Sequence, residues 1–210
     1  MRKMEENKME KNKIRAVFDE KTITVYQAYC KEIALPAVEN QKFVPPFKIS
    51  RMTWIKPSFL WMMYRAGWAT KEGQEHILAI KIKRDGFDWA IKNGCLSHFD
   101  KSIYGNEQEW RTKINTLPIR IQWDPEKDVY LNNLSYRSIQ IGLSGIAVKK
   151  YVDEWITSIE DITNLCKTIH MLIEQNKINE AQKLLPKEKI YEKVGNELEP
   201  IYYLKNKKDE

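Results

Sequence analysis

The stretch Ile77-Leu-Ala-Ile-Lys-Ile-Lys83 is the clearest strand signal in the chain, and it decides the fold class. From its second residue onward, bulky aliphatic side chains alternate with Ala or Lys, a pattern typical of a strand with one buried side. Leu78, Ile80 and Ile82 are therefore expected to face a core. The stretch predicts a sheet that is covered on one side by the rest of the chain.

A second alternating stretch, Pro118-Ile-Arg-Ile-Gln-Trp-Asp124, predicts another strand. Ile119, Ile121 and Trp123 take one face of it, and we expect them to share a core with the first strand. Arg120, Gln122 and Asp124 take the opposite face. Three polar groups therefore converge on one side of a single strand.

The remaining segments mix strand and helix signals without a regular βαβ rhythm, which indicates an α+β fold. Further strands are expected at 14–18 and 136–143, and helices at 25–38, 85–95, 145–155, 159–173 and 179–185, with one more that starts near Lys56-Pro-Ser58. We therefore predict one domain with a small mixed or antiparallel sheet and helices concentrated toward the C-terminus. Its expected bounds are a flexible basic arm at 1–12, the α+β domain at 13–204 and a charged tail at 205–210.

The composition is that of a soluble globular protein, with 210 residues, 42% hydrophobic and 30% charged. No apolar run approaches the roughly 20 residues that a membrane span needs, so no membrane association is expected. The N-terminus is charged and lacks the apolar segment of a secretory signal, which predicts a cytoplasmic protein. The net charge of +6 permits an anionic partner, although lysines near both ends supply part of it.

Several familiar sites are missing from the sequence. It contains no GxSxG, GxxxxGK[ST], GxGxxG or HExxH motif, which removes the usual hydrolase, P-loop, Rossmann and zinc-protease signatures. Cys30, Cys95 and Cys166 are far apart and predict free thiols rather than disulfides or a metal site. No metal cofactor is expected.

The stretch from Arg51 to Arg65 (Arg-Met-Thr-Trp-Ile-Lys-Pro-Ser-Phe-Leu-Trp-Met-Met-Tyr-Arg) concentrates cations and tryptophans. Its Lys56-Pro-Ser58 segment resembles a helix start, with Pro near the first turn and Ser available to cap a free backbone N–H. Arg51, Thr53 and Lys56 then precede a helix N-terminus, where anions such as phosphates are favoured. The alternative is a core helix with a tryptophan-rich entry.

Two further groups suggest chemistry. In Gln122-Trp-Asp-Pro-Glu126 a strand is expected to end at Pro125, so that Asp124 and Glu126 hold ribose hydroxyls or steady an oxocarbenium ion; the alternative is a capped turn with Glu126 in solvent. Arg15, on the polar face of the first strand, either clamps a phosphate or pairs with one of these carboxylates.

The blocks that carry these residues resemble an uncharacterised family, domain of unknown function 4291. They are 14–19, 25–29, 51–62, 122–126 and 137–143, in that order, within a region of roughly residues 13–175. The resemblance implies that the blocks belong together, but it brings no assigned activity.

The order of Arg15, Thr53 with Ser58, and Glu126 also resembles the ADP-ribosyltransferase superfamily, in one branch of which an Arg, a Ser/Thr motif and a Glu surround NAD. The chain departs from that pattern, since Thr53-Trp-Ile-Lys-Pro-Ser58 replaces Ser-Thr-Ser and Asp124 replaces the usual Gln or Glu. The resemblance implies that Arg15 holds phosphate, Trp54 or Tyr26 stacks on a ring and Glu126 stabilises the sugar cation.

Three functional hypotheses follow. The first is an ADP-ribosyltransferase-like protein that binds NAD and transfers ADP-ribose to an acceptor. The second is a non-enzymatic RNA- or DNA-binding module, and the third is a structural or protein-interaction domain whose tryptophans lie in the core. The second requires an open cationic and aromatic platform built from Arg51, Trp54, Lys56, Trp61 and Arg65. The sequence does not predict an oligomeric state.

Overall fold

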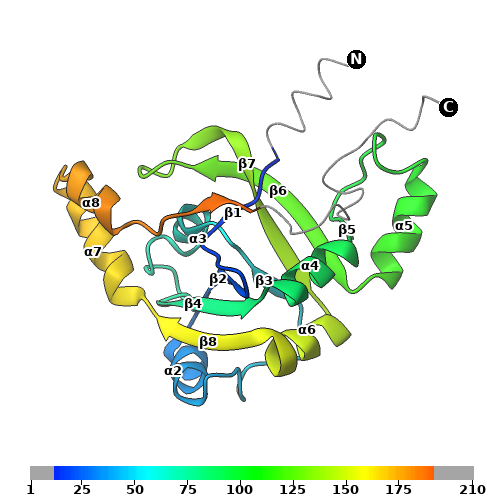
Figure 1. Cartoon of the computed structure of the whole chain (residues 1–210), viewed down its shortest axis with the longest axis horizontal. Helices are drawn as coiled ribbons and strands as arrows, with labels where there is room; N and C mark the ends of the chain where they lie inside the picture. The colour runs from blue at the N-terminus through cyan, green and yellow to red at the C-terminus, as the bar shows by residue number, and fades with distance from the viewer. Residues whose placement is uncertain (1–11, 192–210) are drawn as a thin grey trace.

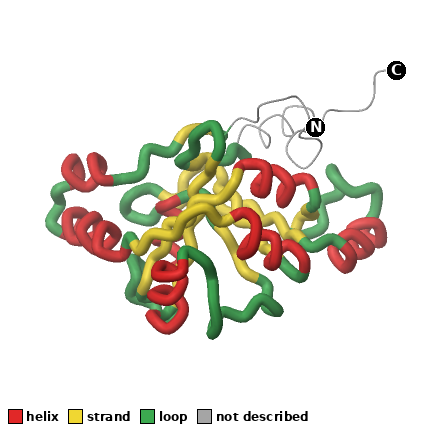
Figure 2. Tube along the Cα trace, turned by 60° about the horizontal axis from the view of Figure 1, so that its bottom comes forward, coloured by secondary structure: helices red, strands yellow, loops and turns green. Residues whose placement is uncertain are grey.

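The computed structural model describes residues 12–191; the predicted arm, apart from its last residue, and the predicted tail lie outside the described residues. Within 12–191 the strands form three sheets (Figure 1). Figure 2 shows these strands gathered in the middle of the molecule with helices around them. The fold is a single α+β domain, as the sequence predicts.

The first sheet is antiparallel and has the order β2-β4-β8. It consists of β2 (Thr22–Tyr29), β4 (His76–Lys83) and β8 (Ile156–Asp161). Val25 and Ile159 both lie opposite Ile80, and all three side chains are buried. Helix α2 (Lys31–Asn40) contacts all three strands of this sheet and packs most closely against β8 (Figure 1).

The second sheet is mixed and has the order β3-β7-β6-β5. Only β5 (Gly94–Leu96) runs parallel to its neighbour β6 (Ile119–Lys127), and β7 (Asn133–Leu143) pairs antiparallel with both β6 and β3 (Thr53–Ile55). The third sheet is the short pair β1 (Arg15–Ala16) and β9 (Lys189–Ile190).

Among residues 12–191, one isolated β-bridge joins the first two sheets. The Tyr26 N–H donates to the Lys56 carbonyl over 2.7 Å, which holds β2 beside the end of β3. Residues that are about 30 positions apart in sequence therefore meet at one seam. This seam positions the candidate site described below.

The helices cover the sheets. Helix α3 (Phe59–Ala66) begins after Ser58, whose Oγ accepts a hydrogen bond from the Trp61 N–H over 3.2 Å, so the predicted N-cap is confirmed. The other helices are α4 (Arg84–Lys92), α5 (Glu107–Thr116), α6 (Ile146–Lys150), the π-helix η1 (Tyr151–Trp155), α7 (Thr163–Glu174) and α8 (Ile178–Leu184).

The two predicted strands do share a core. Leu78, Ile80, Ile82, Ile119 and Ile121 belong to one buried cluster, and Trp123 packs against it from a half-buried position. Each aliphatic side chain in this cluster contributes about 1.5–3 kcal/mol relative to an exposed position. The sheets are thus held together by the alternating residues that predict them.

Two expected helices are wrong. The segment 25–38 is split into strand β2 and helix α2, and Ile159 lies in β8, so the later helix begins only at Thr163. Val, Tyr and Ile favour strands, and short apolar runs fit both periods. Both segments form strands because they pair with opposite edges of β4. This pairing satisfies their backbone hydrogen-bonding groups and buries their aliphatic residues.

Among residues 12–191 no helix is long and apolar enough to cross a membrane. Cys95 and Cys166 are buried and Cys30 is half-buried, and all three thiols are free, as the spacing predicts. The polar segment between β5 and β6 contains helix α5.

Candidate functional site

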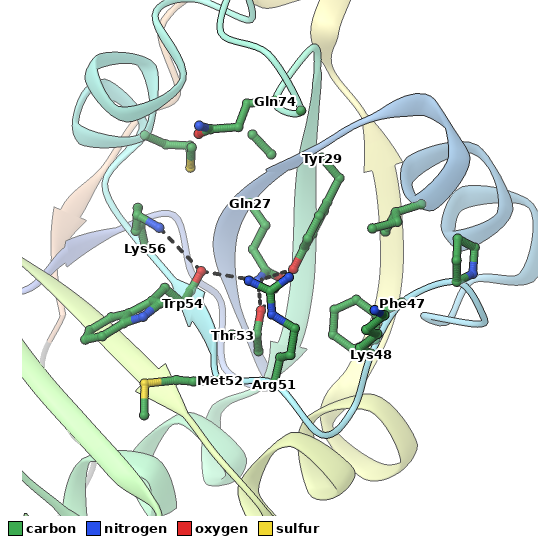
Figure 3. Close-up of a pocket in the computed structure, with 15 residues that line it drawn as sticks. Gln27, Tyr29, Phe47, Lys48, Arg51, Met52, Thr53, Trp54, Lys56 and Gln74 are labelled. Atoms are coloured by element: carbon green, nitrogen blue, oxygen red, sulfur yellow. Dashed lines mark hydrogen bonds between the residues drawn. The ribbon is translucent and has the colours of Figure 1, made fainter.

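A pocket of about 540 Å³ opens where β2, β3 and the loop before β3 meet (Figure 3). Polar side chains lie at its floor, while aromatic rings and cationic side chains lie along its walls. The lining residues are Gln27, Ala28, Tyr29, Ile33, Pro46, Phe47, Lys48, Arg51, Met52, Thr53, Trp54, Lys56, Met62, Gly73 and Gln74.

Gln27 organises the floor of the pocket. Its side-chain amide donates to Thr53 Oγ over 2.6 Å and to the Tyr29 hydroxyl over 2.9 Å (Figure 3). Its Oε1 accepts from the Tyr151 hydroxyl over 2.7 Å, which fixes which way the amide faces. Tyr151 is fully buried on the π-helix η1, so the floor is held rigidly from behind.

Arg51 lies at the mouth of the pocket. Its side chain is exposed, and its guanidinium extends toward the Tyr29 hydroxyl (Figure 3). Burial raises the pKa of Tyr29 to about 12, while its hydrogen bonds to Thr53 and Gln27 and the charge of Arg51 oppose the rise. No carboxylate within the described part of the chain forms an ion pair with Arg51, so its charge is available to an anion.

Lys56 lies on the wall of the same pocket and is only 7% exposed. Its Nζ donates to the Trp54 carbonyl over 3.4 Å, a long and therefore weak hydrogen bond. Burial, helped by the nearby charge of Arg65, lowers the pKa of Lys56 to about 7, and Asp124 acts in the opposite direction. A larger part of the amine is therefore uncharged at neutral pH than in an ordinary lysine.

Glu126 lies at the other end of the Thr53–Ser58 segment. Its Oε1 accepts hydrogen bonds from Ser58 Oγ and from the Lys127 N–H, each 2.9 Å long. The side chain is 5% exposed, which corrects the expectation that it stands in solvent. Burial raises the pKa of Glu126, and its hydrogen bonds, including one with Ser138, oppose this rise.

The expected strand end at Pro125 is also wrong. β6 continues to Lys127, with an irregular register between Pro125 and that residue. A proline is tolerated inside a strand where the pairing is irregular, because no ladder hydrogen bond is lost there. The continued strand carries Glu126 into the interior.

Arg15 lies near Glu126, and its charge acts on the carboxyl group. The guanidinium carbon is 3.9 Å from the centre of the Tyr136 ring, a cation–π contact. Its Nη1 is buried and has no hydrogen-bond partner among residues 12–191. Arg15 forms no ion pair with Asp124 or Glu126 in the described part of the chain, so the predicted pairing is not found and the phosphate role stays a prediction.

Glu188, just before β9, completes this group. It accepts a hydrogen bond from the Phe59 N–H at the start of α3 over 2.7 Å. Burial, helped by the Glu126 charge, raises the pKa of Glu188 to about 8, while the hydrogen bond from the Phe59 N–H and the charge of Arg15 oppose the rise. We call Arg15, Ser58, Glu126, Tyr136 and Glu188 the carboxylate cluster.

Asp124 belongs to a third arrangement on the polar face of the second sheet. It accepts hydrogen bonds from the side-chain amides of Gln122 over 2.9 Å and Gln140 over 2.8 Å. Gln122 lies opposite Gln140, and Asp124 lies opposite Ser138 within the same β6–β7 pairing, so Asp124 neither caps a turn nor stands at a strand end.

The structure divides the residues that the sequence suggests. Arg51, Thr53, Trp54 and Lys56 line the pocket, whereas Arg15, Ser58 and Glu126 meet in the carboxylate cluster and Gln122 binds Asp124. We expect Arg15, Thr53, Gln122 and Glu126 to line one pocket. Of these four residues, only Thr53 lines the pocket described above.

Tyr26 is a further correction. It is 2% exposed and packs edge-on against Phe59, so it has no free face for stacking on a ligand ring. Gln27, Tyr29, Gln74 and Glu188 were not expected at a site. Gln27 and Tyr29 lie in the segment that the sequence analysis expects to be helical. Polar groups within a strand at these positions are the sequence feature that could have indicated a site.

Together, these features define a one-domain α+β protein with a cation-lined pocket at a seam between sheets. In the part of the chain from 12 to 191, no group of three or more His, Cys, Asp or Glu residues is placed to hold a metal ion. The chain belongs to the family described as Domain of unknown function (DUF4291), whose sequence profile matches residues 13–191. No curated protein matches the chain. The ADP-ribosyltransferase resemblance receives no support from the family match and stays a hypothesis.

Proposed function

We propose that the pocket binds NAD or a related nucleotide. The observation that carries this proposal is an exposed arginine, without a carboxylate partner among residues 12–191, extending over a polar floor between aromatic walls. The pocket volume of about 540 Å³ lies in the range of roughly 300–1,000 Å³ that is typical of small-molecule sites.

Each part of a nucleotide has a matching group in the pocket. Arg51 and Lys48 provide cations for phosphate at the mouth, and an arginine fork suits phosphate geometry. The half-buried Trp54 and the Phe47 ring provide apolar faces for a base or nicotinamide ring. Thr53 Oγ, already bonded to Gln27, offers a hydroxyl group to a ribose.

The transfer of ADP-ribose is the further step of this proposal. It needs a carboxylate to stabilise the positive charge that develops on the ribose as nicotinamide leaves. Glu126 is the candidate that the resemblance to that superfamily implies, and it accepts a hydrogen bond from Ser58. Because Glu126 does not line the pocket, this step requires the ribose to reach it past the Thr53–Ser58 segment. Asp124 is the second carboxylate that the sequence suggests, but its two oxygens are engaged by Gln122 and Gln140.

The nucleic-acid alternative has weaker support. An open platform requires its cations and rings to reach solvent together, yet Lys56 is 7% and Trp61 5% exposed. All seven tryptophans of the chain are described, and each is buried or half-buried. Only Arg51 and Arg65 of the proposed strip are exposed, which leaves too little for a stacking platform.

Isothermal titration of the full chain tests the proposal, with NAD, ADP-ribose, AMP, nicotinamide and a short RNA as ligands. We expect NAD and ADP-ribose to bind and RNA to bind weakly or not at all. Absence of binding by every nucleotide would remove the proposal, and binding of RNA alone would favour the nucleic-acid module. Nicotinamide release, measured with protein and nucleic-acid acceptors, tests the transfer step separately.

A further inference from the structure

The amine of Lys56 is placed differently from those of ordinary surface lysines. Its side chain is 7% exposed, yet it borders a pocket of about 540 Å³, so a ligand in the pocket can reach it (Figure 3). The Trp54 carbonyl, at 3.4 Å, is its hydrogen-bond acceptor among the described residues. A hydrogen bond of this length stabilises the charged ammonium form of Lys56 only weakly.

The charges around the amine favour its neutral form. Arg65 of α3 carries the same sign, and Arg51 lines the same pocket. Asp124 of β6 is the opposing charge, but both of its oxygens accept hydrogen bonds from glutamines. No carboxylate in the region 12–191 lies within ion-pair distance of Lys56. Its lowered pKa of about 7 agrees with this arrangement.

A neutral, desolvated lysine beside a cavity is a nucleophile toward carbonyl groups. We propose that Lys56 forms an imine with an aldehyde or ketone ligand that carries a phosphate group. The nitrogen lone pair attacks the carbonyl carbon to give a carbinolamine. The carbonyl oxygen then leaves as water with the two amine protons, and no oxidant or reductant is needed.

The phosphate in this ligand class follows from the other cations of the pocket. Arg51 and Lys48 line the same pocket as the amine, so one ligand can contact both regions. This activity goes beyond nucleotide binding and does not require it, since any small carbonyl compound with a phosphate group meets the same requirement.

Pyridoxal 5′-phosphate is a suitable probe because it has an aldehyde, a phosphate and a coloured imine. The full chain is incubated with the probe near neutral pH, reduced with borohydride and mapped by peptide mass spectrometry. We expect Lys56 to be labelled about 10-fold or more above exposed lysines such as Lys81, because far more of its amine is uncharged. Labelling of Lys56 no greater than that of Lys81 would overturn the proposal.

Two variants and one measurement on the wild type complete the test. Lys56→Arg should lose the coloured imine while keeping a cation, and Lys81→Arg, on the exposed face of β4, should keep it. Acetic anhydride labelling of the wild type against pH reports the Lys56 amine without any substitution. An amine that stays unreactive until the pH of ordinary lysines refutes the idea even if the variant fails to fold. NAD titration with the same proteins separates failure of this step from failure of nucleotide binding.

Discussion

The pocket and the carboxylate cluster lie at opposite ends of one short segment, Thr53–Ser58, but their charged groups differ in whether the protein itself provides partners for them. The pocket presents Arg51 and Lys56 without carboxylate partners in the described chain, at a cavity. In the carboxylate cluster, Glu126 and Glu188 accept hydrogen bonds from the protein itself and share the charge of Arg15. Unpaired cations at a cavity point to a ligand. Carboxylates whose hydrogen bonds all come from the protein stabilise the fold unless a ligand reaches them.

The largest expected effect tests whether the carboxylate cluster takes part in chemistry. If Glu126 stabilises a ribosyl cation, Glu126→Gln should lose on the order of 100-fold or more of nicotinamide release, because the charge is needed mainly in the transition state. The melting temperature should change little, since the amide Oε1 can keep the hydrogen bonds from Ser58 and Lys127.

The assay for this first prediction is nicotinamide release by purified wild type and variant. Glu180→Gln, an exposed position on α8, is the matched control and should keep wild-type turnover. Equal turnover by Glu126→Gln would make the carboxylate cluster purely structural. No turnover by the wild type would remove the transfer step and leave nucleotide binding to be judged alone.

The second prediction concerns the floor of the pocket. Gln27→Leu should lower the free energy of unfolding by about 2 kcal/mol, because the buried Tyr151 hydroxyl loses its acceptor. Urea denaturation measures the change. Gln108→Leu, on the exposed face of α5, should shift stability far less. A similar loss in both variants would mean that the floor network adds no special stability.

The strands of this fold were predictable where burial follows a local pattern. Alternation at 77–83 and 118–124 identified β4 and most of β6, since one face of each strand is buried. In contrast, β2 carries buried residues at successive positions, Ile23 to Gln27, so its pattern has no clear period. Its identity depends on pairing with β4, which is a long-range property.

The same reasoning explains which parts of the site were predictable. Arg51, Thr53, Trp54 and Lys56 stand close together in sequence and in space, so their composition marked the pocket. Glu188 reaches the start of α3 from far along the chain, and no local pattern indicates that contact. The division of Thr53 and Ser58 between two sites depends on the bridge between Tyr26 and Lys56.

The third prediction sharpens the role of the pocket cations. Arg51→Ala should weaken binding of NAD or ADP-ribose about 10-fold or more, the usual cost of a lost hydrogen bond to a charged group. The side chain is exposed and forms no ion pair with a described residue, so stability should barely change. Titration calorimetry measures the affinity, and Arg111→Ala, an exposed position on α5, is the charge-matched control. Unchanged affinity in Arg51→Ala would place the ligand elsewhere.

The smallest expected effect is a pH dependence from the carboxylate cluster. Burial raises the pKa of Glu188 from 4.5 to about 8, so the folded chain holds this proton more tightly than the unfolded chain. The resulting stability is fully present below the ordinary pKa and is lost as the pH rises through 8. Because the side chain is only half-buried, we expect about 1 kcal/mol of loss between these limits.

Glu188→Gln isolates this contribution, because its amide stays neutral and its Oε1 can still accept from the Phe59 N–H. We expect the difference in unfolding free energy between wild type and variant to move in favour of the variant as the pH rises from about 5 to 8. Urea denaturation across this range measures the difference. Glu180→Gln should give a difference that is flat with pH, since that carboxylate is exposed. A flat difference for Glu188→Gln as well would mean that Arg15 and the start of α3 compensate the buried charge fully. The carboxylate cluster would then resemble the pocket, because both would stabilise an anionic group.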